Sequence, residues 1–380
     1  MSGTFAELCR IESPSGRERR CAERVIAELR ALDVDVREDR AGELTGSDCG
    51  NLHAMVAAGP APEGAQAGAG AGRPSVLLCA HLDTVPLQAP VEPVLVDGYW
   101  ENSREGILGA DNKAAIAVIL ALARHVHKAG GPLDLELLFT VGEETALAGA
   151  RAFDASQLSS EFGYVFDHAS PIGEVIMSSP THFRIEASFH GLAAHAGIRP
   201  QDGRSAILAA ARAIASMPHG RLDEQTTVNV GTISGGSAMN VVAEACTMVA
   251  EVRGIDDERA RAVAGEVVDR IHEAANLPEC ESDVDVTVER TFSGYRLAPG
   301  SPAVRCAEAA LSSCGYEPSR IASGGASDAN ALLAQGFQTV NLANGTERNH
   351  EPGERVSDAA LGEMLDVALA LLDEAAALSR

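Results

Sequence analysis

Apolar residues in the first part of the chain form short continuous runs and longer runs with a helical period. Residues 17–32 place apolar side chains every three or four positions with charges between them, which predicts an amphipathic helix. The predicted strands are VLLCA (76–80), LELLFTV (135–141) and YVF (164–166), and the predicted helices between them are 114–130 and one from Thr145. Strands that alternate with helices predict a mostly parallel sheet covered by helices on both faces.

The pattern changes near residue 180. Two strand-helix-strand halves follow each other there, which predicts a small α+β unit of ferredoxin-like type. Its predicted strands are 181–189, 226–233, 246–254 and 283–289, and its predicted helices are 205–217 and 257–275. Beyond it, a helix (302–314), a strand (339–343) and a last helix (357–378) return to the first pattern. The sequence therefore predicts an α/β domain in two parts, 1–179 and 292–380, with an inserted domain at 180–291.

Composition excludes several classes of protein. The 380 residues carry 30 basic and 54 acidic side chains, a net charge of −24, which opposes binding to nucleic acid or an anionic membrane. No apolar run approaches the ~20 residues of a membrane span, and the start of the chain has no signal-peptide core. The eight cysteines include no C-x-x-C pair, which argues against a thiolate zinc site or a disulfide framework. We expect a soluble, cytoplasmic protein.

The stretch at 57–74 is rich in Gly, Ala and Pro without an apolar period, which predicts a surface loop. Its glycines at 68, 70 and 72 precede a strand instead of following one and have the spacing G-x-G-x-G. A dinucleotide-binding loop follows its strand, so this interpretation is rejected.

Histidine and carboxylate side chains occur where the predicted strands end or a helix begins. These residues are His81 and Asp83 in AHLDTVP, Asp111 in GADNKAA, Glu143 and Glu144 in TVGEET, Asp167 in FDHAS, and His350 in NHEPGE. Ligands of open α/β sheets bind beyond the carboxyl ends of the strands, so we expect these groups to converge on one crevice.

Imidazoles and carboxylates without a thiolate favour zinc or a similar ion, and a bridging carboxylate allows two ions. Asp111 is the candidate bridge, because a helix N-terminus stabilises its charge. Asp83 is placed to accept the far ring N–H of His81. Of Glu143 and Glu144, one can bind metal and the other can act as general base.

Each residue also has a simpler interpretation. Asp111 or Asp167 taken singly would usually be a helix N-cap, and the pair Glu143 and Glu144 could form a solvated first helical turn. Five other histidines are expected to be ordinary surface or core residues: His53, His125, His127, His219 and His272. These interpretations do not explain why so many of the groups sit at strand ends.

The motifs AHLDTVP, GADNKAAIA, TVGEETALAGA, FDHAS and NHEPGE, in this order, resemble the zinc-dependent exopeptidase family of peptidase T, carboxypeptidase G, aminoacylase and succinyl-diaminopimelate desuccinylase. The resemblance runs from about Ser13 to Glu354. Three further segments, at 191–207, 229–245 and 323–337, are similar to the peptidase T-like branch. Ala115 departs from the glycine that many relatives have there, which loosens the branch assignment slightly and leaves the metal assignment untouched.

The resemblance implies a catalytic domain that holds two Zn²⁺ ions and an inserted domain that dimerises. His81 and Asp167 would hold one ion, Glu144 and His350 the other, and Asp111 would bridge them together with a water or hydroxide. Glu143 would be the general base and Asp83 would support His81. Co²⁺ or Mn²⁺ would fit the same oxygen and nitrogen ligands.

The resemblance also assigns substrate contacts. His195 in the inserted domain would polarise the scissile carbonyl, reaching the site from the partner subunit in dimeric members. Asn240 and Arg253 would contact substrate, although Arg253 could equally pair with a surface acid. Gly324 and Gly325 would let the backbone approach the substrate closely.

The function implied is hydrolysis of amide bonds in short peptides by a tripeptide aminopeptidase-like homodimer. One alternative keeps the fold and metals but acts as an N-acyl amino acid amidohydrolase, a deacylase or a carboxypeptidase. Another is a non-catalytic metal-binding or peptide-binding module, which would be expected to lack a general base. The presence of Glu143 argues against it.

Overall fold

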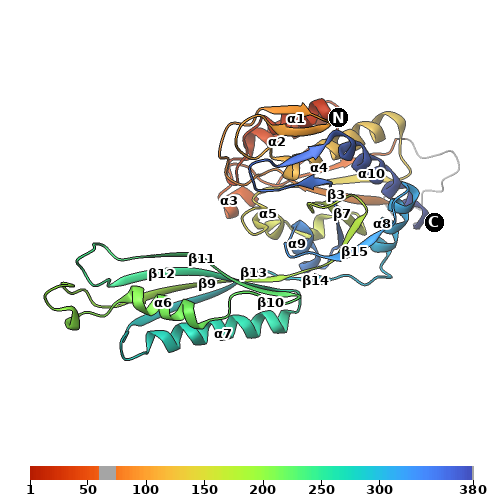
Figure 1. Ribbon diagram of the computed structural model, residues 1–380. Helices are drawn as coiled ribbons and strands as arrows, with labels where there is room; N and C mark the ends of the chain where they lie inside the picture. Colours follow the sequence, from red (N-terminus) through yellow and green to blue (C-terminus); the bar gives the residue numbers. More distant parts are fainter. Residues whose placement is uncertain (60–73, 379–380) are drawn as a thin grey trace. The chain divides into compact units, whose positions relative to one another are not determined.

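The computed structural model describes residues 1–59 and 74–378 (Figure 1). Most of the predicted loop at 57–74, including the glycines at 68, 70 and 72, lies outside the described residues. The chain separates into two compact units. Met1–Met177 with Leu297–Arg380 form the first unit, and Ser178–Arg296 form the inserted unit.

A nine-stranded mixed sheet, whose central strands run parallel, forms the centre of the first unit. Its order is β1 (Val36–Glu38), β2 (Leu52–Val56), β6 (Asp134–Thr140), β3 (Ser75–His81), β7 (Phe162–Phe166), β16 (Gln338–Leu342), β8 (Glu174–Ser179) and β14 (Tyr295–Arg296), and β15 (Ser319–Ala322) pairs with β8. Neighbours β6, β3, β7 and β16 run parallel. The predicted fold class is confirmed.

Helices lie on both faces of this sheet. They are α1 (Ser2–Cys9), α2 (Arg19–Arg30), α3 (Ala41–Thr45), α4 (Ala110–Ala129), α5 (Ala148–Ala152), α8 (Pro302–Ser313), α9 (Asp328–Ala334) and α10 (Asp358–Leu378). Alternate residues of β3 point to opposite layers: Leu78 and Ala80 belong to the apolar core that contains α4, whereas Cys79 lies 3.8 Å from Asp328 of α9. Among the described residues, no helix has the length and apolarity needed to cross a membrane.

Two features of the first unit differ from the prediction. A small four-stranded sheet of β17 (Thr346–Glu347), β18 (Arg355–Ser357), β5 (Tyr99–Asn102) and β4 (Pro93–Val96) was not predicted, because its strands are short and mostly not buried and have no apolar period. The helix predicted from Thr145 is present, but it starts three residues later. Ala146 and Leu147 have positive φ angles of 62° and 60°, so helix α5 begins only at Ala148.

The inserted unit is one antiparallel sheet with two helices. The sheet order is β10 (Gly220–Asp223), β11 (Thr226–Gly235), β12 (Ala245–Gly254), β9 (Thr181–His190) and β13 (Asp283–Phe292). Helices α6 (Ala206–Ser216) and α7 (Asp257–Ala275) share an apolar core with the sheet. The four longer strands have the order of a ferredoxin-like fold, as predicted, and β10 is an added edge strand.

Candidate metal centre

The carboxyl ends of three neighbouring parallel strands bring the predicted residues together. His81 is the last residue of β3, and the pair Glu143 and Glu144 follows β6. Asp167 directly follows β7. Because β6, β3 and β7 are adjacent and parallel, these side chains emerge at one edge of the sheet.

Asp111 links two groups of side chains. Its Oδ1 lies 3.2 Å from His81 Nε2, and that nitrogen is 3.8 Å from Asp167 Oδ1. Its Oδ2 lies 3.2 Å from His350 Nε2, which is 2.9 Å from Glu144 Oε1. In each group of three the ligand atoms lie within 4.8 Å of one another. The structure thus brings together two ligand groups that share one carboxylate.

A third group contains the predicted base. Atoms of His81, Glu143 and Glu144 also lie within 4.8 Å of one another. Glu143 is 9% exposed and the Glu144 side chain 8%, so the alternative of a solvated helical turn is wrong. Asp111 does not act as an N-cap either, because its carboxylate oxygens face His81, His350 and Asn349.

The two histidines have raised pKa values because they face carboxylates. Burial alone would lower the pKa of His81, but contacts with Asp111, Asp167 and Asp83 hold it well above its ordinary value. Contacts with Asp111 and Glu144 raise the pKa of His350 to about 10.

The carboxylates show that the cluster holds excess negative charge. Burial, with the nearby Asp167, raises the pKa of Glu143 well above its usual range. Burial also raises the pKa of Glu144 and of Asp167, and in both the charge of Asp111 adds to the effect. Asp111 alone keeps a low pKa, since the contacts with His350 and His81 outweigh its burial.

This donor set fits metal cations. Four largely buried carboxylates meet two imidazoles, of which His81 is buried and His350 is about half exposed, and no lysine or arginine within the described ranges forms an ion pair with any of them. Buried carboxylates without a partner are costly, so a bound cation would relieve their repulsion. Imidazole nitrogen with carboxylate oxygen is the ligand combination of Zn²⁺, Co²⁺ and Mn²⁺ sites.

Asp83 organises more of the centre than the sequence indicated. Its carboxylate lies 3.3 Å from His81 Nδ1, and its backbone carbonyl lies 3.0 Å from the same nitrogen. Oδ1 also accepts the backbone N–H of Glu143 (3.0 Å), and Oδ2 accepts that of Glu144 (3.1 Å) and the hydroxyl of Ser15 (2.7 Å). One buried carboxylate therefore fixes an imidazole and the turn that carries both glutamates.

Sequence reasoning missed the residues that hold Asp167 and Asp111. Asn341 accepts the backbone N–H of Asp167 (3.0 Å) and donates to its carbonyl (2.9 Å), and Asn112 Nδ2 donates to its Oδ1 (2.8 Å). Asn349 Nδ2 donates to Asp111 Oδ2 at 2.9 Å. Asn112 and Asn349 lie within the motifs that carry the resemblance, but their type alone gave no role.

The residues predicted to contact substrate lie in other segments of the chain than these ligands. Gly324 and Gly325 form the exposed loop before α9. In the inserted unit, the exposed residues His195 and Asn240 are neighbours, since Ala196 N donates to Asn240 O at 2.9 Å. Their contacts with substrate stay predictions.

Arg253 has a partner within its own strand. Its Nε and Nη2 lie 3.2 and 3.1 Å from the two carboxylate oxygens of Glu251, two residues earlier in β12. The surface ion pair that was the alternative is therefore present. A contact between Arg253 and substrate stays a prediction.

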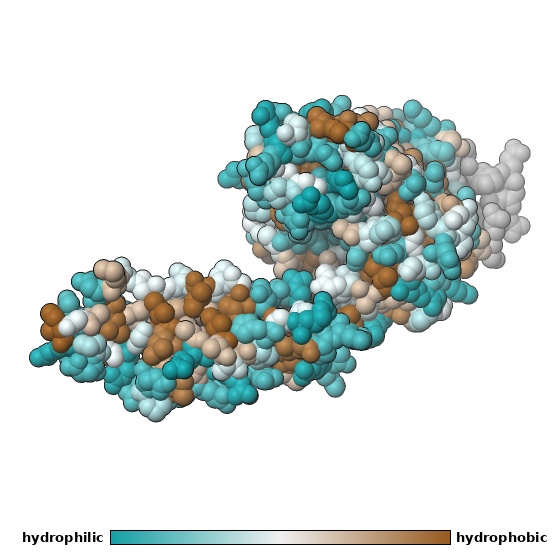
Figure 2. Space-filling view, viewed as in Figure 1, coloured by the Kyte–Doolittle hydropathy of each residue, from teal (hydrophilic) through white to brown (hydrophobic). Residues whose placement is uncertain are grey.

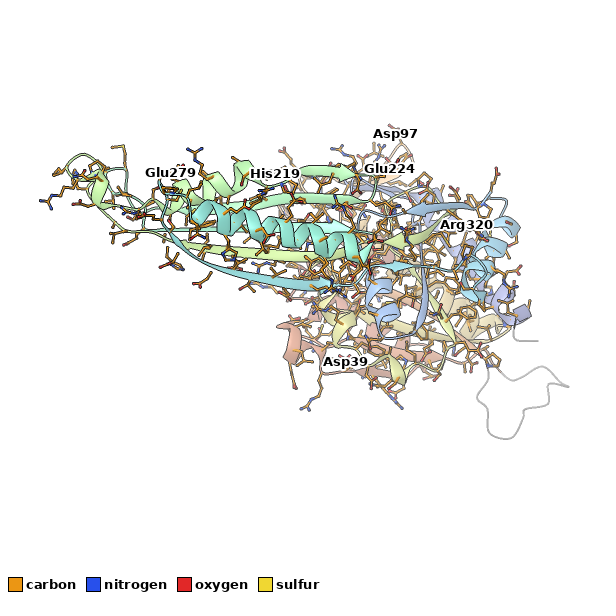
Figure 3. All side chains as sticks on the ribbon, turned by 90° about the horizontal axis from the view of Figure 1, so that it is seen from below. Asp39, Asp97, His219, Glu224, Glu279 and Arg320 are labelled. Atoms are coloured by element: carbon orange, nitrogen blue, oxygen red, sulfur yellow. The ribbon has the colours of Figure 1, made fainter. Side chains whose placement is uncertain are left out.

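Two histidines outside the cluster have ordinary structural roles. His219, labelled in Figure 3, is exposed and its Nε2 lies 2.8 Å from the carbonyl of Ile214. His53 lies 2.9 Å from the buried carboxylate of Glu136. Both histidines agree with the interpretation of them as surface or core residues.

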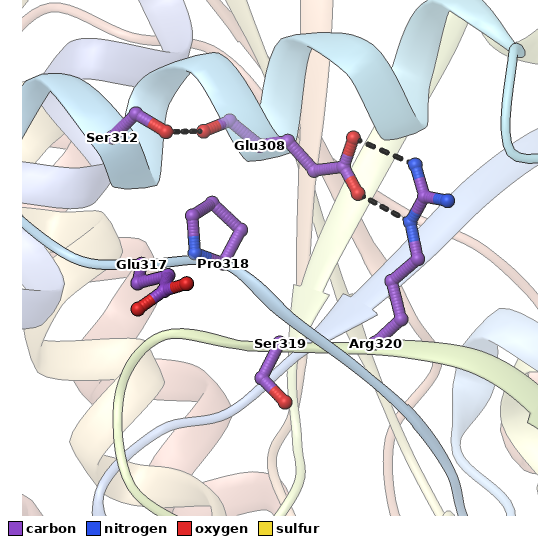
Figure 4. A pocket seen from close by; sticks show the side chains of 6 residues that line it. All are labelled: Glu308, Ser312, Glu317, Pro318, Ser319 and Arg320. Atoms are coloured by element: carbon purple, nitrogen blue, oxygen red, sulfur yellow. Dashed lines mark hydrogen bonds and ion pairs between the residues drawn. The ribbon is translucent and has the colours of Figure 1, made fainter.

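A surface pocket of about 760 Å³ lies elsewhere in the first unit (Figure 4). Its lining includes Glu308 and Arg320, which form a bidentate ion pair. Arg320 Nε lies 2.6 Å from Glu308 Oε1, and Arg320 Nη2 lies 3.0 Å from Glu308 Oε2. None of the candidate ligands lines it, so it is separate from the metal centre.

Comparison with known proteins decides the family. Residues 181–277 match the model of the peptidase dimerisation domain of M20 peptidases, and residues 65–196 match that of peptidase family M28. Aminopeptidase PepT from Bacillus cereus is 32% identical with a TM-score of 0.84, over 99% of this chain and 98% of its own. The chain belongs to the M20 family of metallopeptidases. It is a peptidase T-like hydrolase of that family.

Two further relatives agree over nearly the whole length. A tripeptidase from Staphylococcus aureus is 31% identical with a TM-score of 0.89, covering 99% of this M20 peptidase and 98% of its own chain. The uncharacterized protein YqjE of Bacillus subtilis is 32% identical over 98% of this chain and 97% of its own length. The family resemblance drawn from the motifs is confirmed.

Proposed function

We propose that this M20 peptidase is a dinuclear zinc aminopeptidase that cleaves short peptides, tripeptides in particular. The observation that carries the proposal is the pair of ligand groups that share Asp111. In this proposal His81 and Asp167 hold one ion, Glu144 and His350 hold the other, and Asp111 contacts both. The B. cereus aminopeptidase and the S. aureus tripeptidase, each about a third identical over nearly the full chain, support this substrate class.

The bound ions would supply Lewis-acid polarisation of the scissile carbonyl and an acidified water. Glu143 acts as the general base that takes a proton from the attacking water and passes it to the leaving amine. Its backbone is held by Asp83, and its carboxylate is buried among the ligands, so it is kept close to the reacting atoms. Asp83 keeps the His81 ring oriented, with Nδ1 toward its own oxygens and Nε2 toward Asp111.

The test compares peptides that differ only at the amino end. The metal-free protein is reconstituted with Zn²⁺ and assayed with a free tripeptide and with the same tripeptide N-acetylated. We expect cleavage of the free tripeptide only, and loss of that cleavage in Glu143→Gln. Cleavage of the N-acetylated peptide alone would show a deacylase instead, and cleavage of both peptides would show a carboxypeptidase. A protein loaded with two ions that cleaves neither peptide would contradict the proposal.

We also propose that the peptidase forms a homodimer through the inserted unit. Strand β10 pairs with β11 only at residues 226–228, so residues 229–235 of β11 have a strand on one side only within the described part of the chain. Unpaired strand edges readily pair with another copy, and a two-fold axis lets the same segment face itself.

Exposed apolar side chains beside this edge support the dimer. Figure 2 shows hydrophobic residues on the surface of the inserted unit, and Ile207, Leu208 and Ile233 are 40%, 37% and 49% exposed. The end of β11 meets the start of α6, since a Cβ at Gly236 would lie 3.1 Å from Ile207. We expect Ile233→Asp to give a monomer in sedimentation, whereas Leu44→Asp in the first unit leaves the dimer intact. A monomeric wild type would contradict this proposal.

We also propose that the protein is located in the cytoplasm. All eight cysteines are free thiols, and seven of them are buried. Secreted chains of this cysteine content usually form disulfides, so free thiols favour a reducing compartment. Cell fractionation with an antibody tests this, and recovery in the exported fraction would contradict it.

A further inference from the structure

Glu354 is a fully buried carboxylate for which the mechanism above has no use. It is 1% exposed and lies in the NHEPGE segment, four residues after the candidate ligand His350. Its Oε2 accepts the backbone N–H groups of Leu108 (2.8 Å) and Gly109 (2.7 Å), and its Oε1 accepts that of Asp111 (2.9 Å). One side chain thus satisfies three buried backbone donors about 245 residues away in the sequence.

The backbone of residues 108–111, which Glu354 binds, is not held by regular helical hydrogen bonds. Although α4 spans Ala110–Ala129, Asp111 and Asn112 have non-helical backbone angles, with ψ of 105° and 24°. Gly109 before them has a left-handed φ of 75°. The regular hydrogen bonds of the helix therefore do not determine where the Asp111 carboxylate points. The three bonds to Glu354 fix the backbone from which that carboxylate projects.

We propose that Glu354 is a positioning residue of the metal centre, which aims Asp111 at both ion positions without contacting either ion. This inference rests on the proposed function, because it assumes that Asp111 is the shared ligand. Asn349, from the same segment, donates to Asp111 Oδ2 and so holds the carboxylate end while Glu354 holds the backbone end. The segment 349–354 then supplies one ligand, His350, and two restraints on another.

The chain offers a matched control in Glu136. It is 0% exposed and accepts the backbone N–H groups of Ser159 (2.9 Å) and Ser160 (2.8 Å). It lies near the amino end of β6, whereas the candidate ligands follow the carboxyl ends of the strands. Replacing it disturbs a buried carboxylate and its backbone donors without touching the segment that carries Asp111.

The experiment measures Zn²⁺ affinity by competition with a chromophoric chelator, on folded protein checked by circular dichroism. We expect Glu354→Gln to weaken zinc binding about 10- to 100-fold, as is typical for residues that orient metal ligands. Glu354→Asp, which keeps the charge but is shorter, should lie between Glu354→Gln and wild type. Glu136→Gln should bind zinc within about twofold of wild type, because a merely structural change lowers stability without changing the site.

Each result bears on the proposal. Wild-type zinc affinity in folded Glu354→Gln, or an equal loss in Glu136→Gln, would overturn it. Failure of both Glu354 variants to fold would also overturn it, because the carboxylate would then be needed for folding and not only for orienting Asp111. If the wild type hydrolyses tripeptides and Glu354→Gln binds zinc as tightly as the wild type does, only this inference is refuted. If the wild type binds no zinc, the proposed function is refuted as well.

Discussion

Asp83→Asn should damage the metal centre through three neighbours at once. The carboxylate accepts the backbone N–H groups of Glu143 and Glu144 and lies beside the His81 ring. An amide keeps one acceptor oxygen and presents its NH₂ where the other oxygen was, so one of the two glutamate N–H groups loses its partner. A hydrogen bond to a charged group contributes about 1.5–3 kcal/mol, so we expect the free energy of unfolding of the metal-free protein to fall by about 2 kcal/mol.

Zinc binding should weaken in the same variant. A changed partner of a metal-binding imidazole typically lowers metal affinity 10- to 100-fold, or by about 1.4–2.7 kcal/mol. Urea unfolding of the metal-free protein gives the first quantity and chelator competition gives the second. Glu136→Gln, which loses buried bonds elsewhere, should show only the loss of stability. If Asp83→Asn were destabilised but bound zinc as wild type does, the assignment of Asp83 to the metal centre would be refuted.

Three further predictions concern catalysis, assembly and pH. Glu143→Gln should lower kcat about 10²- to 10⁴-fold with two zinc ions still bound, measured by tripeptide hydrolysis and metal analysis, and loss of zinc would speak against a base role. Mixing Glu143→Gln with His195→Ala subunits should restore about a quarter of wild-type activity if His195 acts on the partner's site of a two-fold dimer, and none if it acts within its own chain. Contacts with His182 and Arg253 lower the pKa of Glu251 from 4.5 to about 2, so its contribution to stability is present above pH 4.5 and is lost as the pH falls towards 2. The stability advantage of wild type over Glu251→Gln, ~1 kcal/mol at pH 6 for a pair that is about one-third exposed, should vanish across that interval in urea titrations, and an unchanged gap would contradict this.

The sheet and the ligand positions could be predicted because both leave local marks in the sequence. A buried parallel strand is a short apolar run, so a polar residue directly after it, such as His81 after VLLCA, lies at the carboxyl edge of the sheet. The strands of the inserted unit could be predicted equally well, since β9 alternates buried and half-buried residues along Thr181–His190. The roles of the individual ligands stay predictions.

What could not be predicted depends on contacts between distant segments. The β4 strand exposes Val94 and Leu95, so no burial pattern marks it as a strand. Glu354 binds the backbone of Asp111 across 243 residues, and nothing near Glu354 in the sequence shows which donors it will meet. Likewise, Asp83 was expected to contact His81, two residues away, but not a turn 60 residues later.

Anomalous diffraction at the zinc absorption edge, from crystals of the reconstituted peptidase, tests the central claim most directly. The account predicts two peaks roughly 3.5–4 Å apart, the spacing of two-metal sites. One peak should lie between His81 and Asp167 and the other between Glu144 and His350, with Asp111 touching both. A single peak, or peaks away from Asp111, would contradict it.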